Sequence, residues 1–427
     1  MPSRKHTRPS PPGARKRRLN DWLESYIKFT QNTEPPLSFH VWSGISTLAS
    51  ALQRRAYMVW GHETIYPNQY IVLVGPSGKS RKGVAIGIAR DLMQSVRISI
   101  TAQRITREAL YKFMKDSTVA FTDKTTRRYK FQCPVTAIAT ELQVFLGMKN
   151  VEFLAELTDW YDSLDEWTYE TKWSGVDRII GMCFNLLGGT APDWLPSILP
   201  AEAVGGGFTS RIIFVVEEAK GKTVTNPNKY KEDLKLRDDL AYDLEQILLL
   251  SGEMKFTDEA LAVYEKWYGE EDERLNLGTQ DIVDPRLAGY NSRRATHVKK
   301  ISMAISASRS NDLVITLEDF DRALTLMTTT EKKMPRVFTG LSRGRFAEAI
   351  EDVLYILASR RVITRSQILR ENYLKIDTFV MDAVETMLEE MQVIKIDRTK
   401  GLGDKIYTYT GGSSMDLLQH PVPDEPS

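Results

Sequence analysis

The chain has 427 residues, of which 42% are hydrophobic and 26% are charged, and its formal net charge at pH 7 is +1. Its length predicts two or three domains, and its composition is typical of a globular protein with a sizeable core. No apolar run approaches the roughly eighteen residues of a membrane-spanning helix, so the sequence predicts a soluble protein with no membrane partner.

Residues 1–18 hold seven lysines and arginines, four prolines and no acid, which predicts a disordered basic arm. Such an arm either contacts nucleic-acid phosphates or serves only as a solubilising tail. Apolar residues at helical spacing follow from 19 to about 59, interrupted at Pro35-Pro36. Residues 19–66 are therefore expected to form a helical entry segment.

The next segment, 67–235, alternates short β-rich runs with helical patterns, which predicts an α/β core. Strands are expected over 70–74, 135–140, 179–187 and 212–216, and helices over 83–93 and 151–161.

Helical patterns dominate the remainder of the chain. Three or four amphipathic helices are expected over 236–340, as in a helical lid. Within 345–411 three helices precede two strands, which is the order of a winged helix. The polar tail, 412–427, contains three prolines and is expected to be disordered.

Cysteine and histidine usage bears on metal sites and on the compartment. Cys133 and Cys183 each lie in an apolar stretch, and the five histidines show no metal-ligand spacing. This pattern predicts neither a disulfide nor a zinc site, and it fits a reducing cytoplasm.

The strand 70–74 runs into a glycine- and serine-rich loop and then into a helix, the context of phosphate binding. The loop residues are Gly75, Pro76, Ser77, Gly78, Lys79, Ser80, Arg81, Lys82 and Gly83. ATP needs backbone N–H groups and a lysine there, and magnesium needs a hydroxyl, for which Ser80 is the candidate. The standard motif is clean in neither register, because counting from Gly75 puts Arg81 where its lysine belongs, and anchoring on Lys79 requires a glycine where Leu73 stands. Lys79 and Lys82 therefore both remain candidates.

Three further residues follow in the order that an ATPase site requires. Glu141 ends the strand 135–140 and is the candidate for orienting the attacking water. Thr190 follows a third strand and is the candidate sensor of the phosphates. Arg211 precedes the strand 212–216 on a short turn, where it could act as an arginine finger toward a neighbouring subunit.

Taken in chain order, these parts and the helical lid resemble an AAA+ ATPase, and in detail the minichromosome maintenance (MCM) helicases, over roughly residues 70–410. The stretches that carry the resemblance are 187–192 continuing to 210–212, 256–268, and Arg293-Arg294 leading to 315–319. The resemblance implies an AAA+ core with a lid. It also implies that Arg294, or its neighbour Arg293, reaches the γ-phosphate from that lid.

The entry segment, with Phe39-His40-Val41-Trp42 and Tyr66-Pro67-Asn68, and the loop end Arg81-Lys82-Gly83 resemble a family of phage and mobile-element ATPases associated with helicases or primases. That resemblance favours Lys82 over Lys79 as the phosphate lysine. It also places Gly83 where the family has serine or threonine.

Two basic hairpins are expected to contact DNA. MCM-like motors carry a hairpin before the sensor strand, and here 167–175 alternates aromatic residues and contains Lys172 and Trp173. A second hairpin, 124–130, combines Arg127, Arg128 and Lys130 with an aromatic residue, as single-strand channels do. Both could instead be solvated turns.

The sequence therefore predicts an ATP- and magnesium-dependent DNA helicase or translocase. The resemblance implies a phage replicative protein that forms a hexameric ring in the bacterial host cytoplasm, with other replication proteins as further partners. The main alternative is a nucleotide-gated, DNA-binding initiator or loader adapter with little hydrolysis. An ATPase of phage defence or DNA packaging is a third class.

Overall fold

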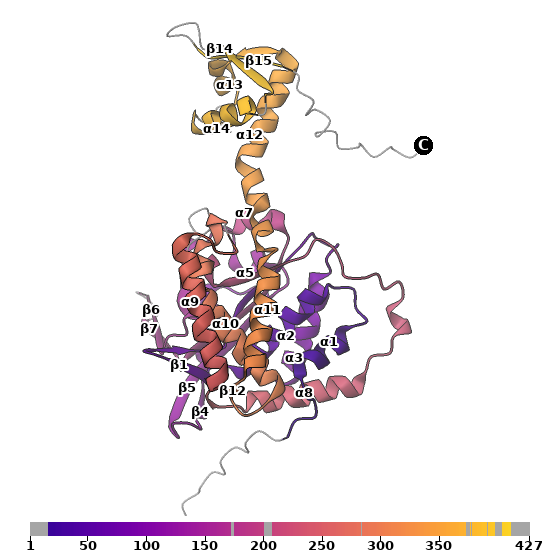
Figure 1. The fold of residues 1–427 in the computed structure, drawn as a ribbon, viewed down its shortest axis with the longest axis vertical. Coiled ribbons are helices and arrows are strands. Elements are labelled where there is room, and N and C mark those ends of the chain that lie inside the picture. Colours follow the sequence, from indigo (N-terminus) through magenta and orange to yellow (C-terminus); the bar gives the residue numbers. More distant parts are fainter. Residues whose placement is uncertain are drawn as a thin grey trace, which may run out of the picture. The chain divides into compact units, whose positions relative to one another are not determined.

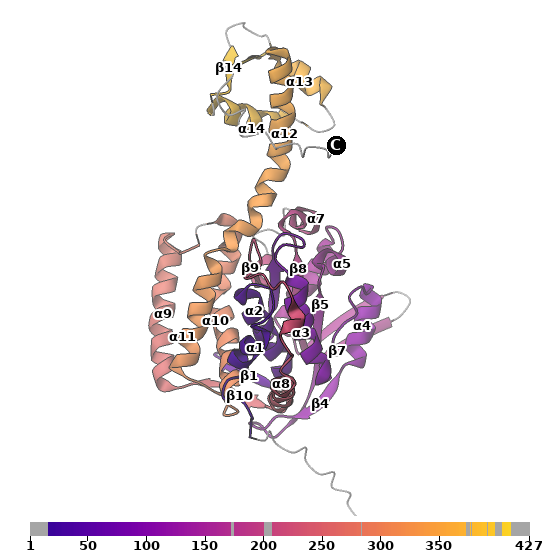
Figure 2. The same ribbon diagram turned by 90° about the vertical axis from the view of Figure 1, so that its right-hand side faces the viewer.

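The computed structural model describes residues 16–410 except 172–174, 200–206, 283, 373–375, 377, 391 and 398–403. The fold is mixed α/β, as the sequence predicts (Figures 1 and 2). The chain forms two compact units, one ending at Phe338 and the other beginning at Thr339. The residue boundaries expected at 66 and 235 do not separate compact units, because the described segments on both sides of each boundary belong to the first unit.

A five-stranded sheet in the order β4-β5-β8-β3-β9 forms the centre of the first unit. Its parallel strands are β5 (Tyr129–Ala139), β8 (Met182–Thr190), β3 (Tyr70–Val74) and β9 (Ile212–Val216). The edge strand β4 (Val119–Thr122) is antiparallel to β5. Every residue of β3, β8 and β9 is buried, as expected for parallel strands covered on both faces.

Helix α2 (Leu37–Leu52) lies across this sheet and contacts β3, β5, β8 and β9. It also packs against α1 (Trp22–Thr30), α3 (Lys82–Ser95) and α8 (Leu234–Leu248). Shorter helices of the sheet region are α4 (Arg107–Asp116), α5 (Leu142–Leu146), α6 (Val151–Tyr161) and α7 (Leu195–Ile198).

The predicted helical entry segment is wrong at its end, where β1 (Ala56–Trp60) and β2 (Glu63–Ile65) form a hairpin. The expected disorder is also wrong for the last residues of the basic arm. The Arg17 guanidinium donates to Asn311 Oδ1 at 2.7 Å, and Arg18 pairs with Asp239. Residues 1–15 and the predicted tail 412–427 lie outside the described residues.

The helices expected as a lid are α8 and three helices that lie side by side, α9 (Asp258–Leu277), α10 (Ala288–Arg309) and α11 (Leu317–Glu331) (Figures 1 and 2). Two short parallel pairings join this region, β11 (Lys255–Phe256) with β12 (Val314–Ile315), and β10 (Gly252–Glu253) with β1. Helix α10 also packs on α2 and on η3 (Thr209–Arg211). The bundle is therefore continuous with the sheet region.

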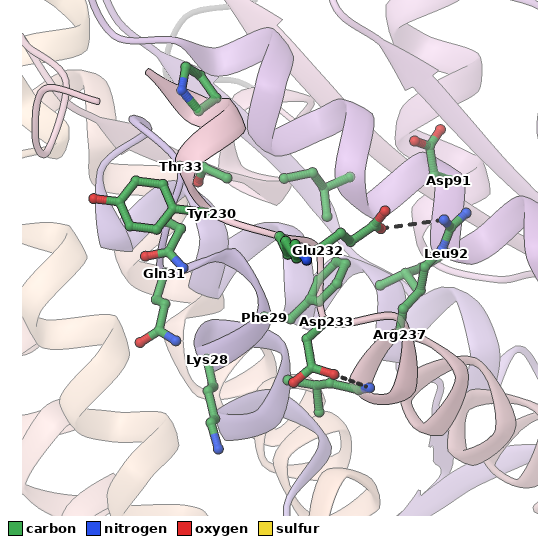
Figure 3. A pocket seen from close by; sticks show the side chains of 15 residues that line it. Lys28, Phe29, Gln31, Thr33, Asp91, Leu92, Tyr230, Glu232, Asp233 and Arg237 are labelled. Carbon is green, nitrogen blue, oxygen red and sulfur yellow. Dashed lines mark hydrogen bonds and ion pairs between the residues drawn. The ribbon is translucent and has the colours of Figure 1, made fainter. Parts of the chain in front are cut away.

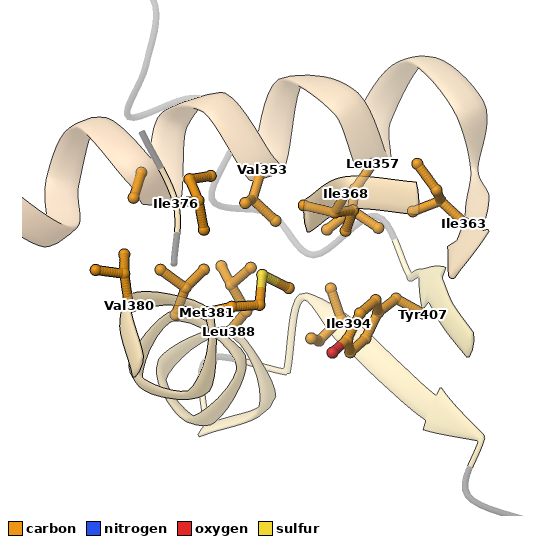
Figure 4. Packing of buried hydrophobic residues seen from close by; sticks show 12 residues of the cluster. Val353, Leu357, Ile363, Ile368, Ile376, Val380, Met381, Leu388, Ile394 and Tyr407 are labelled. Carbon is orange, nitrogen blue, oxygen red and sulfur yellow. The ribbon is translucent and has the colours of Figure 1, made fainter. Parts of the chain in front are cut away.

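The second unit combines α12 (Thr339–Arg360), α13 (Arg365–Glu371) and α14 (Thr378–Glu390) with an antiparallel sheet in the order β13-β15-β14. The strands are β13 (Val362–Thr364), β14 (Ile394–Asp397) and β15 (Ile406–Tyr409). Val353 and Leu357 of α12 face Met381 and Leu388 of α14 across its core (Figure 4). Across both units, none of the helices within the described ranges has the length and apolarity needed to span a bilayer.

Candidate nucleotide site and nucleic-acid surfaces

The predicted phosphate loop, residues 75–83, comprises the connection between β3 and α3 and the first residues of α3, and it is tightly folded. The Gly75 N–H donates to the Thr190 carbonyl at 3.1 Å, which ties the loop to the end of β8. A Cβ at Gly75 would overlap the Glu217 carbonyl and the Ser80 hydroxyl, so only glycine fits there. Gly78, at the tip, has a φ of +70°, a conformation that favours glycine.

The structure distinguishes the two candidate lysines. The Lys82 ammonium is buried and folds back over the loop, 2.5 Å from the Gly75 carbonyl oxygen, whereas Lys79 is exposed. Arg81, directly before Lys82, has a φ of +57°. The standard motif has glycine directly before its lysine, and a left-handed residue there is what glycine would supply. The loop geometry therefore favours Lys82.

Glu141 and Thr190 meet the loop at one edge of the sheet. Val74 pairs with Thr190 and Ala139 with Gly188, so the carboxyl ends of β3, β5 and β8 are level. Glu141 is exposed and accepts from the Gln143 side-chain amide at 2.8 Å. Burial lowers the pKa of Lys82, and the charge of Glu141 opposes that shift.

The same residues determine how ATP and magnesium would be held. Helix α3 has no side-chain N-cap, and the N–H groups of its first turn, together with the Lys82 ammonium, could hold a phosphate group. The Ser80 hydroxyl is buried and donates to the Pro76 carbonyl at 3.2 Å. Gly83 has no hydroxyl, and no cluster of three or more His, Cys, Asp or Glu exists in the part of the chain that the structure describes. The Ser80 hydroxyl, together with the phosphates and water, could bind magnesium.

A cavity of about 450 Å³ lies beside α3, but none of the loop residues line it (Figure 3). Its wall includes Ile88 and Leu92 of α3, Phe29 and Thr33 near the end of α1, and Tyr230. The residue next to Thr33 is Glu34, whose carboxylate pairs with Arg81 of the loop at 2.8 Å. The cavity therefore adjoins the phosphate loop without forming it, and no sequence motif indicated it.

Arg211 lies at the opposite edge of the sheet from the phosphate loop. Its neighbour Ile212 pairs with Tyr70, the first residue of β3, so a strand length of about 13 Å separates the two edges. The Arg211 side chain is buried, pairs with Asp162 and donates to the Gly207 carbonyl at 2.7 Å. Arg293 also approaches Asp162, at 3.5 Å, so both arginines converge on one carboxylate.

Arg294 has a different environment from Arg293. Its guanidinium is buried within the helical bundle, 2.5 Å from Glu271 Oε2 and 2.8 Å from Glu331 Oε2. Burial opposes its charge, but the two carboxylates raise the pKa of Arg294 above its ordinary value. Both partners come from neighbouring helices of the bundle, so Arg294 has a structural role as placed here.

Sequence reasoning missed a buried polar network that joins α10 to the sheet. His297 Nε2 donates to the Ser210 carbonyl at 3.0 Å, so Nδ1 is left to accept from the Tyr161 hydroxyl at 3.1 Å. The Lys300 ammonium donates to Asn68 Oδ1 at 2.9 Å. Burial lowers the pKa of His297 to about 3 and that of Lys300 to about 7. Polar residues on a helix are ordinarily read as solvated, so no sequence signal marked them.

The first predicted hairpin exists as β6 (Glu166–Thr171) and β7 (Gly175–Ile180). Its aromatic residues Trp167 and Tyr169 pack on Tyr111 of α4, with ring centroids 5.4 and 4.6 Å away. Glu166 and Glu170 are exposed on the strand. Lys172 and Trp173, the predicted DNA contacts, lie outside the described residues.

The second predicted hairpin joins β4 to β5. Arg127 and Arg128 are exposed at its turn, as a DNA contact requires. Lys130 is differently placed, because its ammonium lies 2.6 Å from the buried Asp123 carboxylate and above the Tyr57 ring. Of the three predicted contacts, two are presented to solvent and Lys130 is engaged within the protein.

No protein-family model matches this chain, and no curated protein sequence is significantly similar to it.

Proposed function

We propose that this chain is a P-loop ATPase of the AAA+ type that acts on DNA as a helicase or translocase. The observation that carries the proposal is the buried Lys82 ammonium, folded over the loop that follows β3, at the same end of the sheet as Glu141 and Thr190. A solvated Gly/Ser turn would not need a buried lysine, and its burial is costly without a ligand-binding role.

The residues at this edge divide the work of hydrolysis. Bound ATP supplies the phosphoanhydride, and Lys82 exchanges its bond to the Gly75 carbonyl for the phosphate oxygens. Glu141 orients the attacking water and accepts its proton, since it is exposed at the end of its strand. Thr190, buried beside the loop, positions the end of β8 against the phosphates.

The separation of the two sheet edges supports a ring, which we propose to be a hexamer. Arg211 and Arg293 lie too far from their own loop to reach its phosphates, so they would complete the site of a neighbouring subunit. Arg211 would exchange Asp162 for the neighbour's phosphate. Of the two sensor candidates, Arg293 is the one we favour, because Arg294 is held by two carboxylates.

We further propose that the second unit is a winged helix that does not read DNA sequence. Three helices and a three-stranded antiparallel sheet support this fold. Asp382, Glu389 and Glu390 are exposed on α14 and would repel phosphates in a groove. Glu385 is instead buried, where it pairs with Arg365 and Lys405. A role in phage DNA replication within a bacterial cytoplasm, with replication proteins as partners, remains part of the proposal.

The direct test compares Lys82→Ala with Lys79→Ala in an ATP hydrolysis assay. We expect Lys82→Ala to reduce hydrolysis by roughly a hundredfold or more, because it removes a charge from the transferred phosphate's environment. Lys79→Ala, which alters an exposed lysine of the same loop, serves as the matched control and should retain activity within about threefold. Loss of hydrolysis in Lys79→Ala alone would show that Lys79 is the phosphate lysine. Full hydrolysis in both variants would show that this loop is not the ATP site.

A second candidate function is a nucleotide-gated DNA-binding initiator or loader adapter. Two departures favour it, since Gly83 gives no hydroxyl after Lys82 and Thr140 replaces the carboxylate that usually precedes Glu141. DNA-stimulated ATP hydrolysis separates the two functions. Stimulated turnover supports a motor, and ATP-dependent DNA binding without turnover supports the initiator.

A further inference from the structure

Two aromatic rings are exposed on one face of the β4–β5 hairpin. Tyr129 is 84% exposed and Phe131 is 55% exposed. They are two residues apart on β5, so they point to the same face, whereas Lys130 between them points to Tyr57 and Asp123. Across the hairpin they face only the small side chains of Thr122 and Ala120. The protein therefore presents two large rings to solvent on one face of the hairpin.

The exposed charges of the hairpin turn beside these rings are all basic. Lys124, Arg127 and Arg128 are exposed at the turn that precedes Tyr129. The one acid between residues 117 and 132 is Asp123, which is fully buried and paired with Lys130. The turn therefore has the charge that attracts a polyanion.

Aromatic rings beside basic side chains match single-stranded nucleic acid. Unpaired bases can stack on exposed rings, whereas the bases of a duplex are already stacked and paired. Side chains at positions i and i+2 of a strand are about 6.8 Å apart, twice the 3.4 Å rise between stacked bases. One base can therefore lie over each ring while the flanking phosphates reach the turn.

We propose that this face, formed by Tyr129 and Phe131 with Arg127 and Arg128, is a stacking platform for single-stranded DNA. The inference rests on the proposed function only in taking DNA as the substrate. It deepens that function by assigning single strands as the bound form and the β4–β5 hairpin as their site. In the described part of β6–β7 the exposed Arg178 is paired with Glu166, Glu170 adds a further acid, and the rings are packed on α4.

The test is fluorescence anisotropy of the full chain with a labelled oligo(dT) and with a duplex of equal length, without nucleotide, over a series of salt concentrations. Tyr129→Ala combined with Phe131→Ala should weaken single-strand binding by roughly ten- to a hundredfold at an unchanged salt slope. Tyr129→Phe keeps the ring and should bind within about twofold of wild type. Arg127→Ala combined with Arg128→Ala should reduce the slope of log K against log salt by about 1.4. Circular dichroism checks that each variant is folded.

Two outcomes would overturn the platform. Unchanged oligo(dT) binding by the folded double aromatic variant is one. The other is a change in sedimentation coefficient with the same affinity per subunit, which would show that a second copy of the chain covers these rings. ATP hydrolysis by the wild-type chain is measured separately. If the double aromatic variant loses oligo(dT) binding but the wild-type chain does not hydrolyse ATP, the platform stands and the proposed ATPase function fails. If the wild-type chain hydrolyses ATP but the double aromatic variant binds oligo(dT) normally, the ATPase function stands and the platform fails.

Discussion

The carboxyl and amino ends of the parallel strands, here called the carboxyl edge and the amino edge of the sheet, differ in whether their charged side chains are already paired. At the carboxyl edge, the phosphate loop, Glu141 and the end of β8 are held largely by backbone contacts, and Glu141 stays open to solvent. At the amino edge, Arg211 and Arg293 are already paired with Asp162. A ligand can enter the first edge directly, whereas at the second it must replace an existing ion pair. Under the proposed function, the carboxyl edge would bind nucleotide and the amino edge would respond to a neighbouring subunit.

Substitution of Arg211, at the amino edge, is expected to have the largest effect on ATP hydrolysis. Arg211→Ala should reduce ATP hydrolysis by about a thousandfold, because an arginine finger stabilises the charge of the transferred phosphate. ATP binding, measured by calorimetry, should survive because the phosphate loop lies at the other edge. Full hydrolytic activity in the variant would show that Arg211 serves only its ion pair with Asp162.

Mixing two inactive variants distinguishes action on a neighbour from action within one subunit. In a ring of Arg211→Ala and Glu141→Gln subunits, an intact loop can adjoin an intact arginine. Random mixing at equal amounts should restore activity at about a quarter of the interfaces, since each partner is intact half of the time. No recovery in mixed rings, despite mixing confirmed by mass spectrometry, would show that Arg211 and Glu141 of the same subunit act together.

Glu141→Gln should reduce hydrolysis by roughly a hundredfold while ATP binding is retained, because the amide keeps the shape but cannot accept the proton of the attacking water. Glu152→Gln is a suitable control, since Glu152 is an exposed acid on α6 that pairs with Arg107. Single-turnover hydrolysis measures the chemical step. Equal rates for Glu141→Gln and wild type would show that Glu141 is only a solvated residue at the end of its strand and has no role in hydrolysis.

His297 makes the closed amino edge sensitive to acid. Its folded pKa of about 3 lies below the ordinary value of 6.5, so the unfolded chain binds more protons between these two values. Stability is therefore complete above pH 6.5 and falls as the pH is lowered, by about 2 kcal/mol at pH 5 for this residue. In His297→Gln the amide can keep both hydrogen bonds, and this part of the pH dependence should disappear.

Urea denaturation of wild type and His297→Gln at pH 7 and pH 5 measures that difference. The comparison must be between variants, because burial also lowers the pKa of His40, to about 4, and adds to the same pH range. His62→Gln removes an exposed histidine and should keep the wild-type dependence. A His297→Gln curve parallel to wild type would show that the pKa of His297 is the same in the folded and unfolded chain.

The sequence predicts the carboxyl edge better than the amino edge, for a physical reason. The strands 70–74 and 212–216 and the helix 151–161 match the structure residue for residue, because their apolar patterns are local. Residues that follow parallel strands must gather at one edge, so chain order alone assigns Glu141 and Thr190 to the edge that holds the phosphate loop. The edge at which Arg211 lies follows in the same way, since it precedes its strand.

Contacts between distant segments could not be predicted in this way. Lys300 reaches Asn68 across more than two hundred residues, and its helix shows no pattern that marks a buried lysine. The sequence groups Lys130 with Arg127 and Arg128, whereas its pairing with Asp123 depends on the hairpin register. The sequence does not indicate the β1–β2 hairpin, because that segment continues an apolar helical pattern.

Substitution of Gly83 has the smallest expected effect but is the most specific test, because the carboxyl edge lacks a hydroxyl directly after Lys82. A Cβ at Gly83 meets nothing within 4 Å, so Gly83→Ser can add a hydroxyl directly after Lys82 without a clash. If Lys82 is the phosphate lysine, this hydroxyl stands where magnesium is bound in the standard motif, and the magnesium concentration for half-maximal hydrolysis should fall about tenfold. Gly83→Ala separates the hydroxyl from the gain in helix propensity, since it adds the Cβ alone. An equal improvement in both variants would assign the effect to the helix, and a loss of hydrolysis in Gly83→Ser would mean that the glycine itself is required beside the phosphates.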